Sequence, residues 1–286
     1  VVADDADMKI TDVIRGDDHL SNTPKHLLLY QALNWPIPNY IHLPLILGHD
    51  KKRLSKRHGA TAISEYQEMG ILPNAMFNFL SLLGWNPGND REIMNRGQII
   101  NLFSLSKISK SNSIFDEQKL KWMNGNYIGQ MDAEAILNLI HRQLIEKGLI
   151  TPDNENKDYL LRVISLLKSK IKLIREFADL GVYFFHDPEE FDEKARTKYW
   201  KDADVGERLT QLYLSLEKLT PFNEDEIEKC VRDLAENLGI KAAKLIHPAR
   251  LALTGYGVSP GLFELMEVLG RDVVIRRLKR AASANS

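Results

Sequence analysis

The fold class of this chain is decided by residues 10 to 47, which read ITDVIRGDDHLSNTPKHLLLYQALNWPIPNYIHLPLIL. The segment from Ile10 to Ile14 predicts a short strand that ends at the turn-forming pair Arg15-Gly16. Thr23-Pro24 predicts the start of a helix, because a proline at the first helical position loses no hydrogen bond. A second buried strand is expected from Ile41 to Leu47. Strand, helix and strand in this order indicate an α/β sheet.

The character of the chain changes twice after this stretch. The segment that follows Gly48 is first polar and strongly basic, and the run from Pro73 to Gly84 then predicts a helix with one apolar face. Beyond residue 131 no convincing strand pattern remains, and apolar residues recur at helical spacing, as they do at 160, 164, 167, 171 and 174. We therefore expect three parts, which span residues 1–48, 49–130 and 131–286.

Composition excludes several classes of protein. The chain has 286 residues, with 38 Lys and Arg against 39 Asp and Glu, so any affinity for nucleic acid has to come from local patches. Its longest apolar stretch, Leu43 to Leu47, is far shorter than the roughly 20 residues that cross a bilayer, so a membrane protein is not expected. A single cysteine, Cys230, fits a reducing compartment and predicts a cytoplasmic location. The scattered histidines form no pair with metal-ligand spacing, so we expect no metal site within the protein.

The densest chemical signal is a basic run at residues 50–59, which reads DKKRLSKRHG. Its cationic side chains, with a serine hydroxyl and a glycine beside them, are suited to cradle a polyphosphate. The alternative is a solvated loop or a nonspecific nucleic-acid patch, since short basic runs are common. The chain has no Walker A motif, which argues against a P-loop NTPase.

A second run, KISKS at residues 107–111, has the Lys-x-Ser-Lys-Ser pattern of the class I aminoacyl-tRNA synthetases. Only one of the two runs can form the catalytic loop. The first run follows the predicted strand that ends at Leu47, and loops at strand ends build the active sites of α/β sheets. The second run lies between helix-like stretches. We therefore interpret residues 53–57 as the catalytic loop and residues 107–111 as a structural loop.

Segments along nearly the whole chain resemble the glutamyl-tRNA synthetases, in the order that the family has them. The matching segments are ITDVIRGDDHL at 10–20, TPKH at 23–26, RLSKRHGA at 53–60, FD at 115–116, KL at 119–120, WMNG at 122–125, HPARLALTG at 247–255 and PGLFE at 260–264. The resemblance implies that residues 1–48 form the C-terminal half of a Rossmann-type α/β catalytic domain. It further implies that residues 49–130 form the signature loop and stem-contact region, and that residues 131–286 form an all-α anticodon-binding domain.

The activity implied by the resemblance is that of a glutamate–tRNA ligase. Such an enzyme activates L-glutamate with ATP and Mg²⁺ and transfers it to the 3′ end of tRNA-Glu. The His-x-Gly-His signature of class I catalytic domains is absent from these residues. We therefore expect the chain to begin midway through that domain and to be inactive in catalysis by itself. A non-catalytic module that binds tRNA is the alternative, and a cytoplasmic monomer is the expected form.

Site residues of the catalytic part follow from the same resemblance. Lys56 is implied as the catalytic residue, which stabilises the charge that develops on the phosphates. The residues implied in ATP binding are Arg53, Leu54, Ser55, Lys56 and Arg57. Arg15 is implied to pair with the side-chain carboxylate of glutamate, because its planar fork matches two oxygens. The alternative for Arg15 is an ion pair with Asp17 or Asp18. His19 is implied to contact glutamate or the adenylate, and a structural hydrogen bond is the alternative.

Site residues of the helical part are implied to bind tRNA, and they are Lys170, Arg250, Ser259 and Leu262. Lys170 is expected on a helix over 153–180, where some family members use arginine to discriminate an anticodon base. Lysine at this position leaves open whether tRNA-Gln is charged as well. Residues 259–262 offer backbone N–H groups at a helix start, which suit phosphates or base edges. Leu262 is a candidate to stack on a base, whereas Phe263 is expected in the core.

Overall fold

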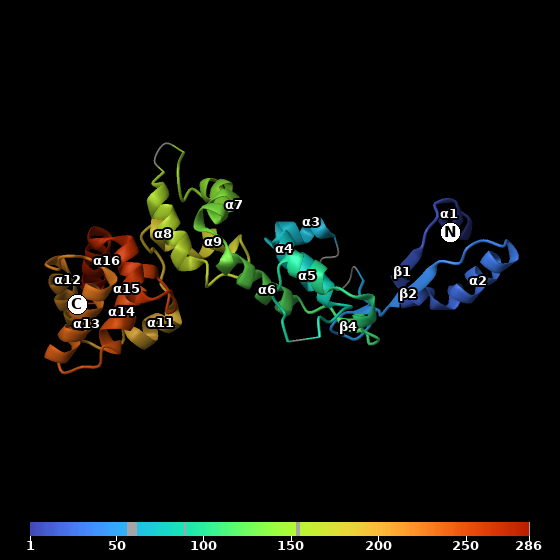
Figure 1. Cartoon of the computed structure of the whole chain (residues 1–286). Helices are drawn as coiled ribbons and strands as arrows, with labels where there is room; N and C mark the ends of the chain where they lie inside the picture. Colours follow the sequence, from blue (N-terminus) through green and yellow to red (C-terminus); the bar gives the residue numbers. More distant parts are fainter. Residues whose placement is uncertain (56–61, 89, 153–154, 286) are drawn as a thin grey trace. The chain divides into compact units, whose positions relative to one another are not determined.

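The computed structural model describes residues 1–55, 62–88, 90–152 and 155–285. These residues divide into two compact units, Val1–Tyr127 and Ile128–Ser286. The first unit runs from blue to green in Figure 1, and the second runs from green to red. Each unit has its own hydrophobic interior, and each is described below by itself.

The first unit contains short helices and four strands. Its helices are α1 (Val2–Asp7), α2 (Thr23–Ala32), α3 (Ile63–Glu68), α4 (Pro73–Leu82), α5 (Arg96–Leu102) and most of α6 (Glu117–Gln130), which ends in the second unit. It also contains the 3-10 helices η1 (Asp17–Asn22) and η3 (Leu105–Lys107). Its strands are β1 (Asp12–Gly16), β2 (Asn39–Leu43), β3 (Ile46–Leu47) and β4 (Ser113–Ile114). The helix predicted from Pro73 is confirmed, and it ends two residues before Gly84.

The predicted strand, helix and strand are confirmed as a parallel pair with a helical crossover. β1 pairs in parallel with β2, and η1 and α2 form the connection between them. Arg15 and Gly16 are the last two residues of β1 and not the turn that we predicted. The expected strand from Ile41 to Leu47 is divided into β2 and β3 around Pro44, which lacks the N–H that a continuous ladder requires.

A second parallel pair, β3 with β4, was not predicted from the sequence. Ile46 lies opposite Ser113, and Leu47 lies opposite Ile114. The backbone N–H of Phe115 extends the pair by donating to the carbonyl of Leu47 at 2.8 Å. A strand of two residues has no detectable alternation, so nothing in the sequence marks β4. This pairing brings the chain after residue 111 beside the strand that precedes the basic run.

The second unit is built from helices and contains no strand among its described residues, as the sequence predicted. Its helices are α7 (Ala133–Glu146), α8 (Lys157–Leu167), α9 (Glu176–Leu180), α10 (Val182–Phe185), α11 (Glu193–Tyr199), α12 (Val205–Glu217), α13 (Glu224–Asn237), α14 (Ala243–Thr254), α15 (Leu262–Leu269) and α16 (Arg271–Ala284). Within the described parts of both units, no helix is long and apolar enough to cross a membrane.

The single helix expected over residues 153–180 is wrong. α8 ends at Leu167, and α9 begins at Glu176. The break is stabilised by the carboxylate of Glu176, which accepts hydrogen bonds from the backbone N–H groups of Lys172 and Leu173 at 2.8 and 3.0 Å. Ile171 and Ile174 are buried although they lie outside both helices, which explains why the apolar pattern continued across the break.

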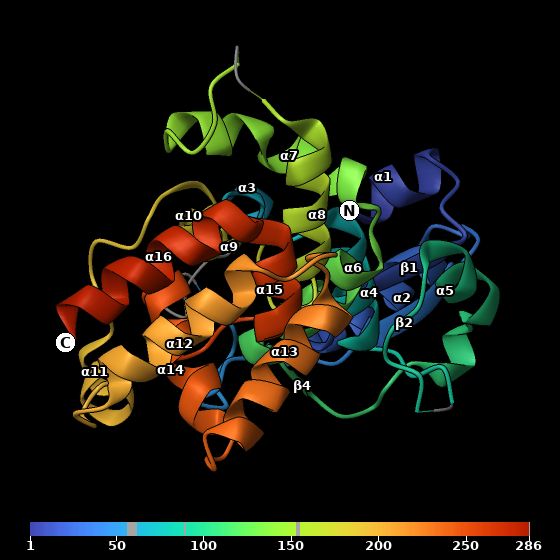
Figure 2. The same ribbon diagram turned by 90° about the vertical axis from the view of Figure 1, so that its left-hand side faces the viewer.

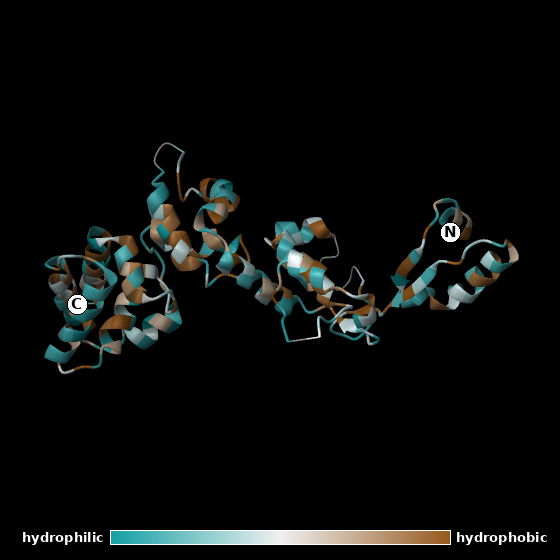
Figure 3. Ribbon diagram, viewed as in Figure 1, coloured by the Kyte–Doolittle hydropathy of each residue, from teal (hydrophilic) through white to brown (hydrophobic). Residues whose placement is uncertain are grey.

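The core of the second unit is built on the packing of α12 against α16, which lie side by side in Figures 1 and 2. Leu209, Leu212 and Leu216 of α12 are fully buried, and Val274 and Leu278 of α16 are fully buried as well. The spacing of three and four residues places each set on one helical face. Figure 3 shows the resulting alternation of apolar and polar segments along these helices. Each buried leucine contributes about 1.5 to 3 kcal/mol relative to an exposed one.

A buried guanidinium joins three segments of this unit. Arg277 of α16 is 4% exposed, and its Nε donates to Asp187 at 2.7 Å. Its other nitrogens donate to the carbonyls of Tyr183 at 2.7 Å, Leu253 at 2.6 Å and His186 at 2.9 Å. Arg276 also donates to Asp187, through Nε and Nη2 at 3.0 and 2.7 Å. Arg277 therefore links α16 to two other segments, namely α10 with the residues that follow it, and the end of α14.

The acid stability of the chain depends on Asp187. Hydrogen bonds from Arg276 and then from Arg277 lower the pKa of Asp187 from 3.8 to about 2, although burial acts in the opposite direction. A lowered carboxyl pKa stabilises the folded state above the unfolded value, and this contribution is lost as the pH falls through the folded value. We expect Asp187→Asn to reduce the free energy of unfolding by about 1 to 2 kcal/mol at pH 7, after allowance for solvent screening, and by progressively less between about pH 4 and pH 2.

Urea unfolding at a series of pH values measures this difference. Asp179→Asn is the matched control, because Asp179 forms a more exposed ion pair with Lys147, and such pairs contribute little. Stability curves of wild type and Asp187→Asn that run parallel from pH 7 to pH 2 would contradict the assignment.

Candidate functional site

The first candidate group is centred on Arg15, at the carboxyl end of β1. The register of the parallel pair places Arg15 opposite His42 of β2, so the two side chains lie on the same face. Arg15 Nε lies 3.5 Å from His42 Nε2, and the guanidinium lies 5.1 Å from the centre of the Tyr40 ring. The strands therefore fix the base of the arginine side chain, and the aromatic ring supports its flat face.

The fork of Arg15 is directed toward the start of α2. Nη2 donates to the hydroxyl of Thr23 at 2.8 Å and to the carbonyl of His19 at 3.4 Å. Nη1 lies 3.5 Å from Nδ1 of His26. All of these partners are neutral groups or rings, and within the described residues no carboxylate pairs with Arg15. The ion pair with Asp17 or Asp18, which the sequence left open for Arg15, is therefore not formed.

His19 contributes to this group through its backbone. Its carbonyl accepts from Arg15 and from the Thr23 hydroxyl, each at 3.4 Å, while the residue itself is exposed on η1. A substrate contact by the His19 ring stays a prediction. The neighbouring His26 has a lowered pKa, first because of burial and then because of the positive charge of Arg15.

The second candidate group is the start of the basic run. Gly48 to Lys51 form a tight turn, closed by the N–H of Gly48 donating to the carbonyl of Lys52 at 2.8 Å. Leu54 then donates to Ile46 at 2.9 Å, so the chain returns antiparallel to β3. Arg53 pairs with Asp18 of η1 at 2.8 Å. Ser55 ends this described stretch.

The central residues of the basic run, Lys56 and Arg57, lie outside the described residues. Their assignment to catalysis and ATP binding stays a prediction. Within the described residues, no group of three or more His, Cys, Asp or Glu side chains is arranged to hold a metal ion.

The competing run at residues 107–111 lies between η3 and β4. Lys107 Nζ donates to the carbonyl of Pro87 at 2.8 Å, and Ile108 forms a β-bridge with Trp85. Ser109 and Ser111 hydrogen-bond to each other. Three of the polar side chains of the run, Lys107, Ser109 and Ser111, are thus engaged in local contacts, which favours the structural role expected for this run.

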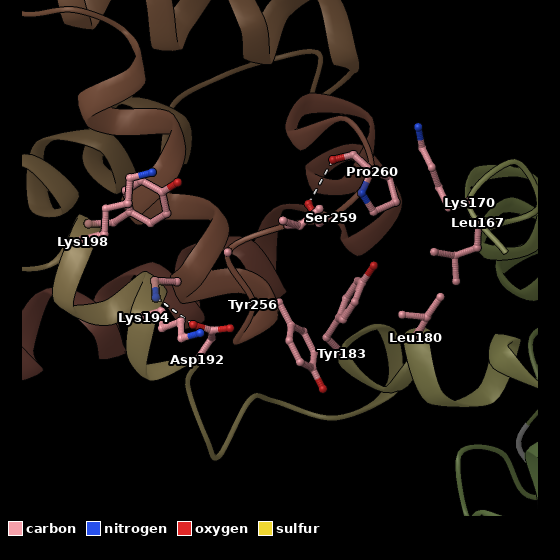
Figure 4. Close-up of a pocket in the computed structure, with 14 residues that line it drawn as sticks. Leu167, Lys170, Leu180, Tyr183, Asp192, Lys194, Lys198, Tyr256, Ser259 and Pro260 are labelled. Atoms are coloured by element: carbon pink, nitrogen blue, oxygen red, sulfur yellow. Dashed lines mark hydrogen bonds between the residues drawn. The ribbon is translucent and has the colours of Figure 1, made fainter.

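The third candidate group is a cavity of about 550 Å³ in the second unit. Figure 4 shows Lys170 and Leu167 on one side, the α11 residues Lys194 and Lys198 on the other, and Tyr183 and Tyr256 between them. Ser259 and Pro260 complete the wall. A pocket of this size with aromatic rings and lysines at its edge suits an unstacked nucleotide, because rings stack on bases and ammonium groups pair with phosphates.

Lys170 and Ser259 both line this cavity, as expected if both contact the same tRNA. Arg250 does not line it. Its Nη1 donates to the hydroxyl of Ser259 and to the carbonyls of Ser259 and Pro260, the last two at 3.2 and 2.7 Å. Arg250 therefore holds the loop that forms the wall, and burial lowers the pKa of its guanidinium.

Leu262 lies in the core and not on the cavity surface. It is 3% exposed at the start of α15, so its side chain has no face to offer a base. Phe263, which we expected in the core, is partly exposed instead. The helical spacing explains both differences from the prediction. Residues 262, 265, 266 and 269 form the buried face of α15, and residue 263 lies outside that face.

Sequence reasoning missed Lys194, Lys198 and Tyr256. The two lysines are four residues apart and lie on one face of α11, so their spacing was a usable signal. Lys198 Nζ lies 5.2 Å from the centre of the Tyr199 ring. Within the described residues, neither Lys170 nor Lys194 has an acidic partner. Asp192 also lines the cavity, so three lysines there stand against one carboxylate and the lining carries a net positive charge.

Comparisons with known proteins identify the family of this chain. Residues 1–122 match the catalytic domain of the class I tRNA synthetases (E and Q), and residues 133–282 match an anticodon binding domain. The chain therefore belongs to the class I tRNA synthetases, in the group that handles glutamate and glutamine. This membership confirms the resemblance to glutamyl-tRNA synthetases and the predicted α/β part followed by a helical anticodon-binding domain.

Several relatives with assigned names are similar over most of this chain. A glutamate–tRNA ligase of Koribacter versatilis is 46% identical over 282 residues, and one of Caldicellulosiruptor saccharolyticus is 43% identical over 279 residues; each comparison covers 98% of this chain. A crystal structure of a glutamate tRNA ligase from Elizabethkingia meningosepticum, in complex with its amino acid, has a TM-score of 0.87 at 33% identity and covers 100% of this chain and 59% of that one. The chain spans 58% of the length of the two curated relatives.

The position of Arg15 can be tested through its effect on His26. The positive charge of Arg15 is the second cause of the lowered pKa of His26. We expect Arg15→Met to raise the pKa of His26, because protonating the ring no longer adds a charge beside a guanidinium. Titration of the histidine ring signals by NMR measures this shift.

Arg53→Met is the matched control, since it removes an equal charge that pairs with Asp18. A pKa of His26 that is the same in Arg15→Met and in wild type would show that the guanidinium does not lie where the structure has it.

Proposed function

We propose that this chain is part of a glutamate–tRNA ligase, which activates L-glutamate with ATP and transfers it to the 3′ end of tRNA-Glu. The observation that carries the proposal is the fork of Arg15, which meets only neutral groups at the carboxyl end of a parallel strand. A cation held in this way suits a substrate carboxylate, since it lacks a carboxylate partner among the described residues. The names of the curated relatives support glutamate as the substrate.

ATP is the proposed second substrate, and the basic run is its proposed phosphate site. Arg53, Leu54, Ser55, Lys56 and Arg57 form the segment that would face the phosphates, with Lys56 as the catalytic residue. Mg²⁺ is proposed to arrive with ATP, where it would neutralise phosphate charge. Arg53 has Asp18 as its partner, so phosphate binding would replace one anionic partner with another. Donors that tighten as charge develops on the phosphates lower the barrier to adenylate formation.

The second unit is proposed to read the anticodon of tRNA-Glu in the cavity between α8 and α11. Lys170 and Ser259 lie on its wall, and Tyr256 is 51% exposed beside them, which leaves a ring face accessible to a base. Arg250 supports the loop from behind. Because lysine at position 170 contacts a base edge with a point charge and not with a fork, tRNA-Gln is proposed as a further, less favoured partner. A monomer in the cytoplasm is the proposed working form.

Lys56 can be tested in a chimera, in which these 286 residues replace the matching segment of the Koribacter versatilis relative. We expect the chimera to catalyse glutamate-dependent exchange of pyrophosphate into ATP. Lys56→Ala should lower this rate by about two to three orders of magnitude, because one donor to the developing charge is lost. Its affinity for tRNA-Glu should stay within about threefold of the unsubstituted chimera, since a surface phosphate contact contributes little alone.

The 286-residue chain itself is the control for catalysis. We propose that it shows no exchange, because it contains no His-x-Gly-His signature. If Lys56→Ala lowers pyrophosphate exchange and tRNA affinity by equal factors, the catalytic role of Lys56 is contradicted. A chimera that binds tRNA-Glu but catalyses no exchange would favour the alternative, a non-catalytic tRNA-binding module.

Anticodon reading can be tested with the chain as it is. We expect it to bind tRNA-Glu more tightly than a tRNA-Glu with an altered anticodon across a salt series. Tyr256→Ala should weaken tRNA-Glu binding by about 1 to 3 kcal/mol through loss of base stacking. Lys170→Ala should weaken tRNA-Glu more than the altered tRNA, because a base contact carries sequence information and a phosphate contact does not.

Lys218→Ala is the matched control for Lys170→Ala, because Lys218 is an exposed lysine of the same unit that does not line the cavity. Filter binding or fluorescence anisotropy gives the affinities. Equal, salt-sensitive binding of both tRNAs by wild type would mean that the cavity does not read the anticodon.

A further inference from the structure

The buried guanidinium of Arg277 lies behind the walls of the cavity described above. It does not line the cavity, and its partners are the carbonyls of Tyr183, His186 and Leu253 and the carboxylate of Asp187. Four donors of one rigid fork are therefore used on acceptors from two segments, residues 183–187 and the end of α14. A lysine offers no such fork, because its donors radiate from a single atom.

The carbonyls that Arg277 binds stand at helix C-terminal ends. Tyr183 lies in α10 and His186 follows its last residue, while Leu253 lies in the last turn of α14. Carbonyls in the last turn of a helix have no partner within the helix and carry its partial negative charge. One guanidinium satisfies such groups from two helices at once, which fixes the distance between the two helix ends.

The same two helices carry separate walls of the cavity. Tyr183 of α10 forms one wall, and the loop after α14, from Tyr256 to Pro260, forms another. Figure 4 shows the rings of Tyr183 and Tyr256 next to each other, and their centroids lie 6.4 Å apart. Any change in the spacing of α10 and α14 therefore changes the gap into which a base would fit.

The loop is held at both of its ends. At its start, Gly255 has a φ of 80°, and its carbonyl accepts a hydrogen bond from the N–H of Asp192 at 2.8 Å. A Cβ at Gly255 would meet the carbonyl oxygen of Glu190 at 2.7 Å. At its end, Arg250 binds the carbonyls of Ser259 and Pro260. The positions of these two ends therefore set the position of the loop. Arg277 fixes the first end, because it binds the carbonyl of Leu253 just before the loop.

We propose that Arg277 is a positioning residue for anticodon discrimination, because it sets the spacing between α10 and the loop that follows α14. This inference rests on the proposed function of the second unit. Arg277 acts through the cavity walls and touches no RNA. Its effect is on the ratio of affinities for cognate and altered tRNA, and not on the nonspecific attraction of phosphates to lysines.

The experiment compares Arg277→Lys with Arg276→Gln in the full chain. Arg277→Lys keeps the buried charge and its carboxylate partner but loses the fork. Arg276→Gln removes an adjacent, exposed arginine that also pairs with Asp187 and leaves all contacts of Arg277 in place. Affinities for tRNA-Glu and for anticodon-altered tRNA-Glu are measured at several salt concentrations, and circular dichroism establishes the folded fraction of each variant.

We expect Arg277→Lys to lower the ratio of the two affinities by about fivefold, as is typical of coupling through packed elements, with the salt dependence unchanged. Arg276→Gln should keep the wild-type ratio. Amide hydrogen exchange in residues 255–259 should become faster in Arg277→Lys only. A purely structural role would lower both affinities in proportion to the folded fraction and leave their ratio intact, which would overturn the inference.

Two outcomes separate this inference from the proposed function. If wild type does not discriminate the two tRNAs, the proposed function falls and the inference falls with it. If wild type discriminates and Arg277→Lys keeps the same ratio, the inference alone falls. Should Arg277→Lys not fold, Asp187→Asn replaces it, because this change weakens the anchor of Nε while all carbonyl acceptors remain; an unchanged ratio and unchanged exchange in residues 255–259 would then overturn the inference.

Discussion

A single buried charge, the guanidinium of Arg277, is the constraint on which the helical unit depends. Transfer of a charge into a protein interior is costly unless hydrogen bonds and a counter-charge replace its water shell. The carboxylate of Asp187 and three carbonyls fill this role, and they come from segments far apart in the sequence. The arrangement of these segments satisfies every acceptor contact of the guanidinium, so the contact links α10, α14 and α16 to one another.

In the first unit the corresponding constraint is the register of two parallel strands. Pairing of β1 with β2 sets Arg15 opposite His42, and the crossover through η1 brings His19 and Thr23 to the same fork. A slip by one residue would turn Arg15 to the other face of the sheet. Backbone pairing therefore sets the position of the Arg15 guanidinium, and side-chain hydrogen bonds then hold it there.

The features that could be predicted from the sequence are those marked by a regular spacing of apolar residues or by a recognisable motif. The crossover, the helix at Pro73 and the helical second unit follow from apolar spacing and from proline at a helix start. The pairing of β3 with β4 was missed because two residues carry no period, and the helix break at Leu167 was missed because buried residues such as Ile171 continue the apolar pattern. The cavity lysines on α11 were missed because only the tertiary structure places that helix across the cavity from Lys170. Arg15, Lys170 and Ser259 were proposed from the family resemblance, and their roles stay predictions.

Gly16 lies at a close contact in the first unit that no sequence motif predicted. The carboxylate of Asp18 folds back over it so closely that a Cβ at Gly16 would meet Asp18 Oδ1 at 2.6 Å. The same carboxylate pairs with Arg53, and the next residue, His19, offers its carbonyl to Arg15. Two consecutive residues, Asp18 and His19, thus connect two cations, Arg15 of β1 and Arg53 of the basic run. If Arg15 binds the carboxylate of an amino acid and Arg53 faces a phosphate, as proposed above, one short piece of backbone would hold both cations, and a displacement of one would be transmitted to the other.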